Sequence, residues 1–185
     1  MAVEQWRPTP QELRLLPRFC QDRFRYGSSL QHPVIARWYR VFGKDFVHIH
    51  HYCAGLNFMN RADRAALRRK DRGFQLQRAF NNFTYIVEKV SPAFPLLPGA
   101  YYHRGRALER MGRTAEAVRD YAEAIRRKPR YAPPYVALAR IHSRAGRRDE
   151  AERVLREGLA ANPDSKLLRR ALARLGRTRG RGAGG

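Results

Sequence analysis

The chain has 185 residues, of which 43% are hydrophobic, so it can form one helical domain with a core but not two large domains. Its formal net charge is +22, and of its 38 basic residues five are lysines and 33 are arginines. This charge attracts nucleic acid, anionic lipid or acidic protein surfaces, although the same composition is typical of a GC-rich genome.

Residues 1–44 are predicted to form an N-terminal helical extension. Thr9 and Glu12 have the spacing of a capping box, which marks the start of a helix, and this helix should continue to about Tyr26. A second, shorter helix is predicted over residues 33–42 because it opens with proline and is followed by glycine.

Residues 45–97 are predicted to form two helices and a linker. Apolar residues recur at helical spacing over residues 45–70 and again over residues 74–90, and Gly73 separates the two stretches. The linker that follows is rich in proline and is therefore expected to be ordered.

Four potential metal ligands lie close together in the first of these helices: His48, His50, His51 and Cys53. At about 100° per residue, His48 and His51 share one side of a helix, while the other two lie on nearly the opposite side. The four therefore cannot bind one ion from a helix. We expect a buried, hydrogen-bonded histidine cluster, with a metal site or general-base chemistry as the alternatives.

The two cysteines of the chain are Cys20 and Cys53. They lie far apart in the sequence and belong to no CxxC pair, so the sequence predicts two reduced, partly buried thiols rather than a disulfide.

Residues 98–131 and 132–165 are two copies of one pattern. At an offset of 34 residues, Gly112 aligns with Gly146 and Pro129 with Pro163. The other aligned pairs include Tyr101 with Tyr135, Gly105 with Ala139, Glu116 with Glu150, and Ala117 with Ala151. Each copy is typical of two antiparallel helices with glycine at the turn and proline after the second helix. Such units stack on one another to bury their apolar faces.

The pattern resembles the tetratricopeptide repeat family, whose period is also about 34 residues. The resemblance implies an all-α, tetratricopeptide-like helical-hairpin solenoid. Residues 98–175 would hold the two clear repeats and a capping helix, and residues 45–97 resemble a degenerate repeat with about 12 extra residues between its helices. Residues 176–185 have nothing to bury and are expected to form a disordered basic tail.

In this family the first helix of each repeat lines a concave groove, which implies a set of partner-binding residues in this chain. They are Tyr102, Arg106, Glu109, Arg110, Val136, Arg140, Ser143, Arg144, Arg170 and Arg174. Arginine can hold carboxylates or phosphates with two hydrogen bonds, although solvated helix faces rich in arginine would show the same pattern. The groove asparagines of chaperone-binding members are missing, so no chaperone partner is inferred.

The sequence therefore predicts a non-catalytic adaptor that binds an acidic or extended segment of a partner protein in an arginine-lined groove, without cofactor or metal. No phosphate-binding loop or nucleophile elbow occurs. A cytoplasmic location is expected, since the sequence shows neither a membrane-spanning run nor the layout of a secretory signal. A nucleic-acid-associated protein is the alternative, and a metal-dependent enzyme built on residues 48–53 is a more distant one.

Overall fold

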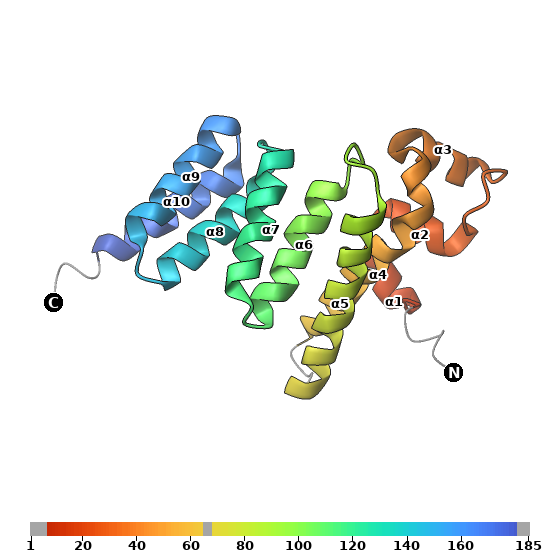
Figure 1. Ribbon diagram of the computed structural model, residues 1–185, viewed down its shortest axis with the longest axis horizontal. Coiled ribbons are helices and arrows are strands. Elements are labelled where there is room, and N and C mark those ends of the chain that lie inside the picture. Colours follow the sequence, from red (N-terminus) through yellow and green to blue (C-terminus); the bar gives the residue numbers. More distant parts are fainter. Residues whose placement is uncertain (1–6, 65–67, 181–185) are drawn as a thin grey trace. The chain divides into compact units, whose positions relative to one another are not determined.

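The structure, a computed structural model, describes residues 7–64 and 68–180 of the chain. Within these ranges all regular structure is helical, with ten α-helices and one 3-10 helix (Figure 1). The predicted all-α class is therefore confirmed. The chain divides into two compact units, Met1–Arg113 and Thr114–Gly185, which we call unit 1 and unit 2. The finer division expected at residues 44, 97 and 175 stays a prediction.

Each unit is a series of helices packed on their neighbours in the sequence. Unit 1 contains α1 (Pro10–Arg14), α2 (Arg18–Tyr26), α3 (Pro33–Phe42), the 3-10 helix η1 (Lys44–His48), α4 (Ile49–Ala62), α5 (Arg69–Lys89) and α6 (Leu97–Arg110). Unit 2 contains α7 (Thr114–Arg127), α8 (Ala132–Arg144), α9 (Arg148–Ala161) and α10 (Lys166–Gly180). No described helix has the length and apolar character that a membrane span requires.

The first predicted helix is in fact two helices. The capping box is confirmed, because the Glu12 N–H donates to Thr9 Oγ1 (3.3 Å) and the Thr9 N–H donates to a Glu12 carboxylate oxygen (2.9 Å). However, α1 ends at Arg14, and α2 begins only after Pro17. Proline has no backbone N–H to donate to a helix, and its ring clashes with the preceding turn. Pro17 therefore explains the break between α1 and α2.

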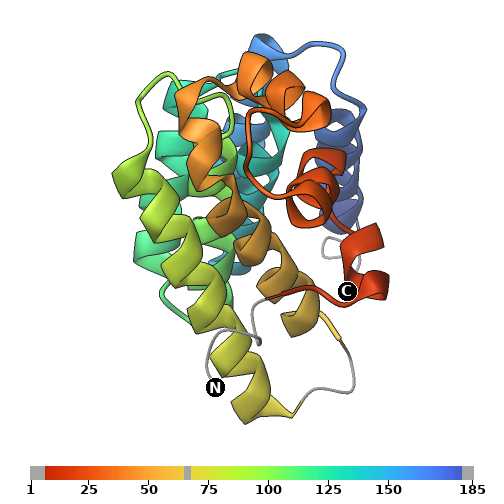
Figure 2. The ribbon, with the colours of Figure 1, turned by 90° about the vertical axis from the view of Figure 1, so that its right-hand side faces the viewer.

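The boundaries around α4 and α5 were also predicted incorrectly. The first helix was expected to run from residue 45 to residue 70, but it starts as η1 and α4 ends at Ala62. The second begins at Arg69 and passes through Gly73, which was expected to separate the two. A glycine inside a helix costs only about 1 kcal/mol relative to alanine, so packing of α5 along α4 can outweigh it. Figure 2 shows these two helices side by side.

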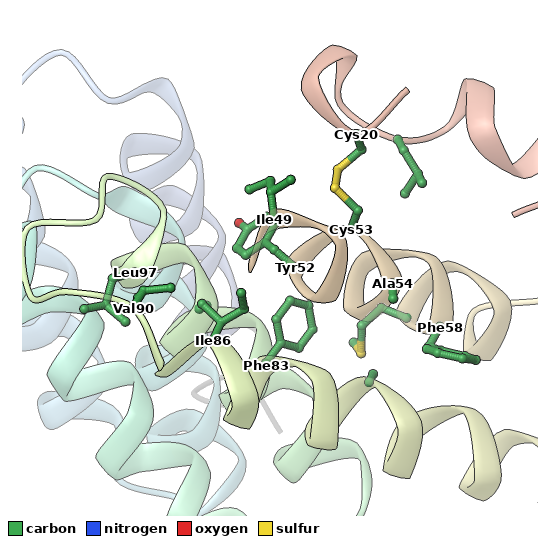
Figure 3. Close-up of a cluster of buried hydrophobic side chains, with 14 of the residues drawn as sticks. Cys20, Ile49, Tyr52, Cys53, Ala54, Phe58, Phe83, Ile86, Val90 and Leu97 are labelled. Atoms are coloured by element: carbon green, nitrogen blue, oxygen red, sulfur yellow. A yellow bond between two sulfur atoms is a disulfide. The ribbon is translucent and has the colours of Figure 1, made fainter. Parts of the chain in front are cut away.

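The prediction of two reduced thiols was wrong, since Cys20 in α2 and Cys53 in α4 form a disulfide (Figure 3). Both cysteines are completely buried and their Cα atoms are 5.5 Å apart. The bond was missed because sequence spacing alone cannot show that two helices bring distant cysteines into contact. The expected cytoplasmic location stays a prediction.

The core of unit 1 lies between α4, α5 and the helices that flank them. Figure 3 shows Tyr52 and Phe83 facing each other across α4 and α5, with their ring centroids 5.7 Å apart. Close approach of the two helices requires Gly55, because a Cβ atom at that position would lie 2.7 Å from the Phe83 ring. The degenerate repeat expected over residues 45–97 stays a prediction.

Unit 2 has the packing that the repeat pattern predicts. Gly146 has a φ of 73° at the turn between α8 and α9, a backbone conformation that favours glycine. Gly158 lies against Tyr135 and Leu168, and an added Cβ would come within 2.9 Å of the Tyr135 ring. The capping helix was predicted to end near residue 175, but α10 continues to Gly180. Residues 176–180 of the predicted disordered tail are therefore helical, and residues 181–185 lie outside the described residues.

Candidate functional site

A hollow of about 360 Å³ opens on unit 2 between α8, α9 and α10. Its lining residues are Val136, Ala139, Arg140, Ser143, Arg144, Leu155, Ala171, Arg174 and Leu175. Ala139, Leu155 and Ala171 are buried and form an apolar floor, whereas Arg140, Arg144 and Arg174 are exposed. The hollow can therefore receive an apolar side chain and place a neighbouring negative charge beside guanidinium groups.

Five of the six residues predicted for the groove in this part of the chain line the hollow: Val136, Arg140, Ser143, Arg144 and Arg174. Arg170, the sixth, is exposed on α10 and is not part of the lining. The predicted residues of α8 all line the hollow, and their role in binding a partner stays a prediction.

Charge is distributed unequally among the helices of unit 2. Neither α8 nor α10 contains an aspartate or glutamate, whereas α7 contains three and α9 contains four. On α9, Arg156 pairs with Glu152 at 2.6 Å and Arg153 pairs with Glu157 at 3.0 Å. The positive charge of α9 is thus balanced locally, while the two helices that carry the arginines of the hollow are purely basic.

The predicted groove residues of unit 1 have a different environment. Arg110 in α6 contacts the Asp63 carboxylate at 2.5 Å and donates to the Ala62 carbonyl at 2.9 Å, at the end of α4. Arg106 lies 3.9 Å from the same carboxylate and 6.0 Å from the centre of the Tyr102 ring. These two arginines therefore hold the C-terminal end of α4, which the repeat alignment alone did not reveal.

Glu109, the remaining predicted residue of unit 1, is half-buried on α6. The structure brings five of the six predicted residues of unit 2 together in one hollow. In unit 1, Arg106 and Arg110 instead contact Asp63 at the end of α4.

Sequence reasoning missed the floor of the hollow, which is formed by Ala139, Leu155, Ala171 and Leu175. These residues had been assigned to helix packing, because small and apolar residues at helical spacing usually face a core. No sequence signal separates an alanine under a neighbouring helix from one under an open hollow.

Two of the three histidines at residues 48–51, His48 and His51, contact residues of α5. His48 Nδ1 lies 3.2 Å from the Tyr85 hydroxyl, and His51 Nδ1 lies 3.0 Å from the Asn82 side-chain oxygen. His50 points elsewhere, with its Nδ1 3.1 Å from the Val47 carbonyl. The predicted hydrogen-bonded arrangement is confirmed for His48 and His51, which join η1 and α4 to α5.

The environment of His50 and His51 favours their neutral form. Burial, together with the nearby His51 and Arg23, lowers the pKa of His50 to about 4, and burial also lowers the pKa of His51. Cys53 is held in the disulfide. Among residues 7–64 and 68–180, no three side chains of the metal-binding types gather at one place, so nothing in the described chain supports the metal-enzyme alternative.

Comparison with known proteins agrees with the repeat pattern. No curated protein was found to match the chain. Residues 108–175 match the model of the tetratricopeptide repeat family. This range covers the whole second predicted repeat, most of the first and the predicted capping helix. The resemblance to the tetratricopeptide repeat family is thereby confirmed over residues 108–175.

Proposed function

We propose that this chain is a non-catalytic adaptor that binds an acidic segment of a partner protein in the hollow of unit 2. Tetratricopeptide repeats generally serve protein–protein interaction, and the match over residues 108–175 supports a protein partner for this chain. The partner segment would place an apolar side chain on the floor of Ala139, Leu155 and Ala171 and a carboxylate beside Arg140 or Arg174.

The observation that carries this proposal is the segregation of charge in unit 2. If the arginine content reflected composition alone, acidic residues would be spread over all four helices. Instead they lie on α7 and α9, and both helices that supply the arginines of the hollow lack them. Electrostatic complementarity of this kind favours an acidic partner and its correct orientation.

The test compares two double variants with the same change in charge. Arg140→Gln with Arg174→Gln removes two guanidinium groups from the hollow, and Arg153→Gln with Arg156→Gln removes two from α9 of the same unit. Proteins captured by the wild-type chain from the native host, after nuclease treatment, are identified by mass spectrometry and then titrated against each variant.

We expect the hollow variant to bind the captured partner at least about tenfold more weakly, since a charged hydrogen bond contributes roughly 1.5–3 kcal/mol. The α9 variant should bind within about twofold of wild type because exposed ion pairs contribute little. Equal losses in both variants would contradict binding in the hollow. Loss of all capture after nuclease treatment would favour the nucleic-acid alternative, for which affinity depends on total charge and salt.

A further inference from the structure

Helix α3 has two opposite faces. Ile35 and Phe42 are buried, and Phe42 stacks between Trp38 and Phe46 at ring distances of 5.8 and 5.9 Å. At about 100° per residue, Arg37, Arg40 and Val41 lie on the other side of the helix, and all three are exposed. The aromatic residues of α3 thus face the core, while arginine and an aliphatic side chain face solvent.

Exposed basic and aliphatic residues also follow α3 in the sequence and line one hollow with the end of α5. Lys44 and Val47 are exposed in η1, and Lys89 is exposed at the end of α5. Lys44, Val47 and Lys89 line one shallow hollow of about 530 Å³, together with Asp45, His48, Val90 and Ser91. The chain has only five lysines, and this hollow holds two of them. We call Arg37, Arg40, Val41, Lys44, Val47 and Lys89 the α3 surface.

The acidic residues near α3 in the sequence are buried. Between residues 13 and 62 the only acidic residues are Asp22 and Asp45, which are 2% and 8% exposed. Asp22 accepts the Trp38 indole N–H at 3.0 Å, and Asp45 accepts the Ser91 backbone N–H at 3.0 Å. No described carboxylate forms an ion pair with Arg37, Arg40, Lys44 or Lys89. On α3 itself the exposed charges are therefore all positive, whereas the hollow between Lys44 and Lys89 also includes Asp45 in its lining, and the exposed Glu88 precedes Lys89.

Exposed aliphatic side chains are concentrated in the same region. Six large hydrophobic residues of the described chain are exposed, and four of them lie between residues 15 and 47: Leu15, Leu30, Val41 and Val47. Exposed apolar residues scattered singly need no explanation, but aliphatic residues interleaved with basic ones are typical of a surface that rests at the lipid–water boundary.

We propose that the α3 surface docks the chain on a bilayer that contains anionic phospholipid. The arginines and lysines would contact lipid phosphates, with one headgroup in the hollow between Lys44 and Lys89, while Val41 and Val47 enter the interfacial layer. Single-stranded nucleic acid fits less well, because its binding relies on exposed aromatic rings and the rings of α3 face the core. This interaction is separate from the hollow of unit 2.

The test is co-sedimentation of the full chain with vesicles of phosphatidylcholine alone and with vesicles that contain about a third phosphatidylglycerol. The charge variant is Arg37→Gln with Arg40→Gln, and its matched control is Arg153→Gln with Arg156→Gln on α9. An aliphatic variant, Val41→Ser with Val47→Ser, keeps every charge. Far-ultraviolet circular dichroism and Trp38 fluorescence verify that each variant is folded.

We expect wild type and the α9 control to bind the anionic vesicles equally and to leave the neutral vesicles unbound. The charge variant should partition about 30-fold less, since each basic residue near an anionic surface contributes roughly a factor of five, and the aliphatic variant at least about threefold less. Equal binding to neutral vesicles, or an equal loss in the α9 control, would overturn the proposal. So would an aliphatic variant with unchanged binding, because a soluble polyanion or an acidic protein would then be the better ligand.

Discussion

Units 1 and 2 use acidic residues in different ways. In unit 1 the buried Glu12 binds Arg61 at 2.9 Å across 49 residues of sequence, and Asp45 binds Ser91 across 46. In unit 2 the ion pairs described for α7 and α9 join residues three or four positions apart on one helix, for example Glu123 with Arg127 and Glu152 with Arg156. Carboxylates thus link distant parts of unit 1, whereas the carboxylate pairs described for α7 and α9 of unit 2 stay within one helix.

This difference reflects how regular each part of the sequence is. A repeat brings every helix against its neighbour through the same small and aromatic positions. The local sequence pattern is therefore sufficient to determine how these helices pack. The N-terminal helices of unit 1 have no such register, and single long-range contacts fix where they lie on α4. The contrast can be tested by removing one contact of each kind, and the variants below run from the largest expected effect to the smallest.

Removing the disulfide should have the largest effect on stability. Cys20→Ala with Cys53→Ala opens a link between residues 33 positions apart, and the loop-entropy estimate gives a loss of about 3–4 kcal/mol in the free energy of unfolding. Urea unfolding followed by tryptophan fluorescence measures it, because Trp38 lies in α3 of unit 1. The reductant dithiothreitol should reproduce the loss in wild type and leave the variant unchanged. A variant as stable as oxidised wild type would show that packing alone holds α2.

Replacing the buried carboxylate of Glu12 should lower the free energy of unfolding slightly less than removing the disulfide does. This loss should depend on pH. Hydrogen bonding from Arg61 lowers the pKa of Glu12 to about 2, with further contributions from Thr9 and Arg64. Because the folded-state pKa lies below the unfolded value of about 4.3, the stabilisation is complete above that value and is lost as pH falls towards 2.

We therefore expect Glu12→Gln to lower the free energy of unfolding by about 2–3 kcal/mol at pH 7 and to match wild type near pH 2. Unfolding curves between these pH values measure the difference. If the difference in free energy of unfolding between the variant and wild type does not depend on pH, the shape of the Glu12 side chain matters rather than its charge.

Overpacking of unit 2 should have a smaller effect. Gly158→Leu forces a side chain against Tyr135 and Leu168, and we expect a loss of about 1–3 kcal/mol, measured by thermal unfolding followed by circular dichroism. The control is Gly176→Leu in α10, where an added Cβ meets no atom within 4 Å. That variant should be neutral or slightly more stable because leucine favours helix more than glycine does. Similar melting temperatures for both variants would contradict the close helix contact at Gly158.

The smallest effect is expected on the surface of α9. Glu152 pairs with Arg156 at 2.6 Å, and the two side chains are 33% and 67% exposed. Glu152→Gln should change the free energy of unfolding by less than about 0.5 kcal/mol, since solvent and salt screen exposed pairs. Urea unfolding at low and high salt measures it. A loss comparable with that of Glu12→Gln would remove the contrast between the two units.

Sequence alone predicted the helical class and the repeated helices of unit 2. The offset of 34 residues identified the helices of the repeats and the turn at Gly146, and the family resemblance implied five of the residues that line the hollow. These features depend on neighbours within one or two helices, where periodicity determines which side chains share a face. The Thr9 capping box was predictable for the same reason, because its two hydrogen bonds span only three residues.

Tertiary structure decided the features that join distant segments. The pairing of Cys20 with Cys53, the turn of Arg110 towards Asp63 and the burial of Asp22 and Asp45 depend on which helices meet in space. A cysteine, an arginine or an aspartate has the same local pattern whether it faces solvent or a partner 30 or more residues away. For that reason the sequence predicted the repeats of this protein, while only the fold showed how its N-terminal helices are fixed and which of its cations remain on the surface.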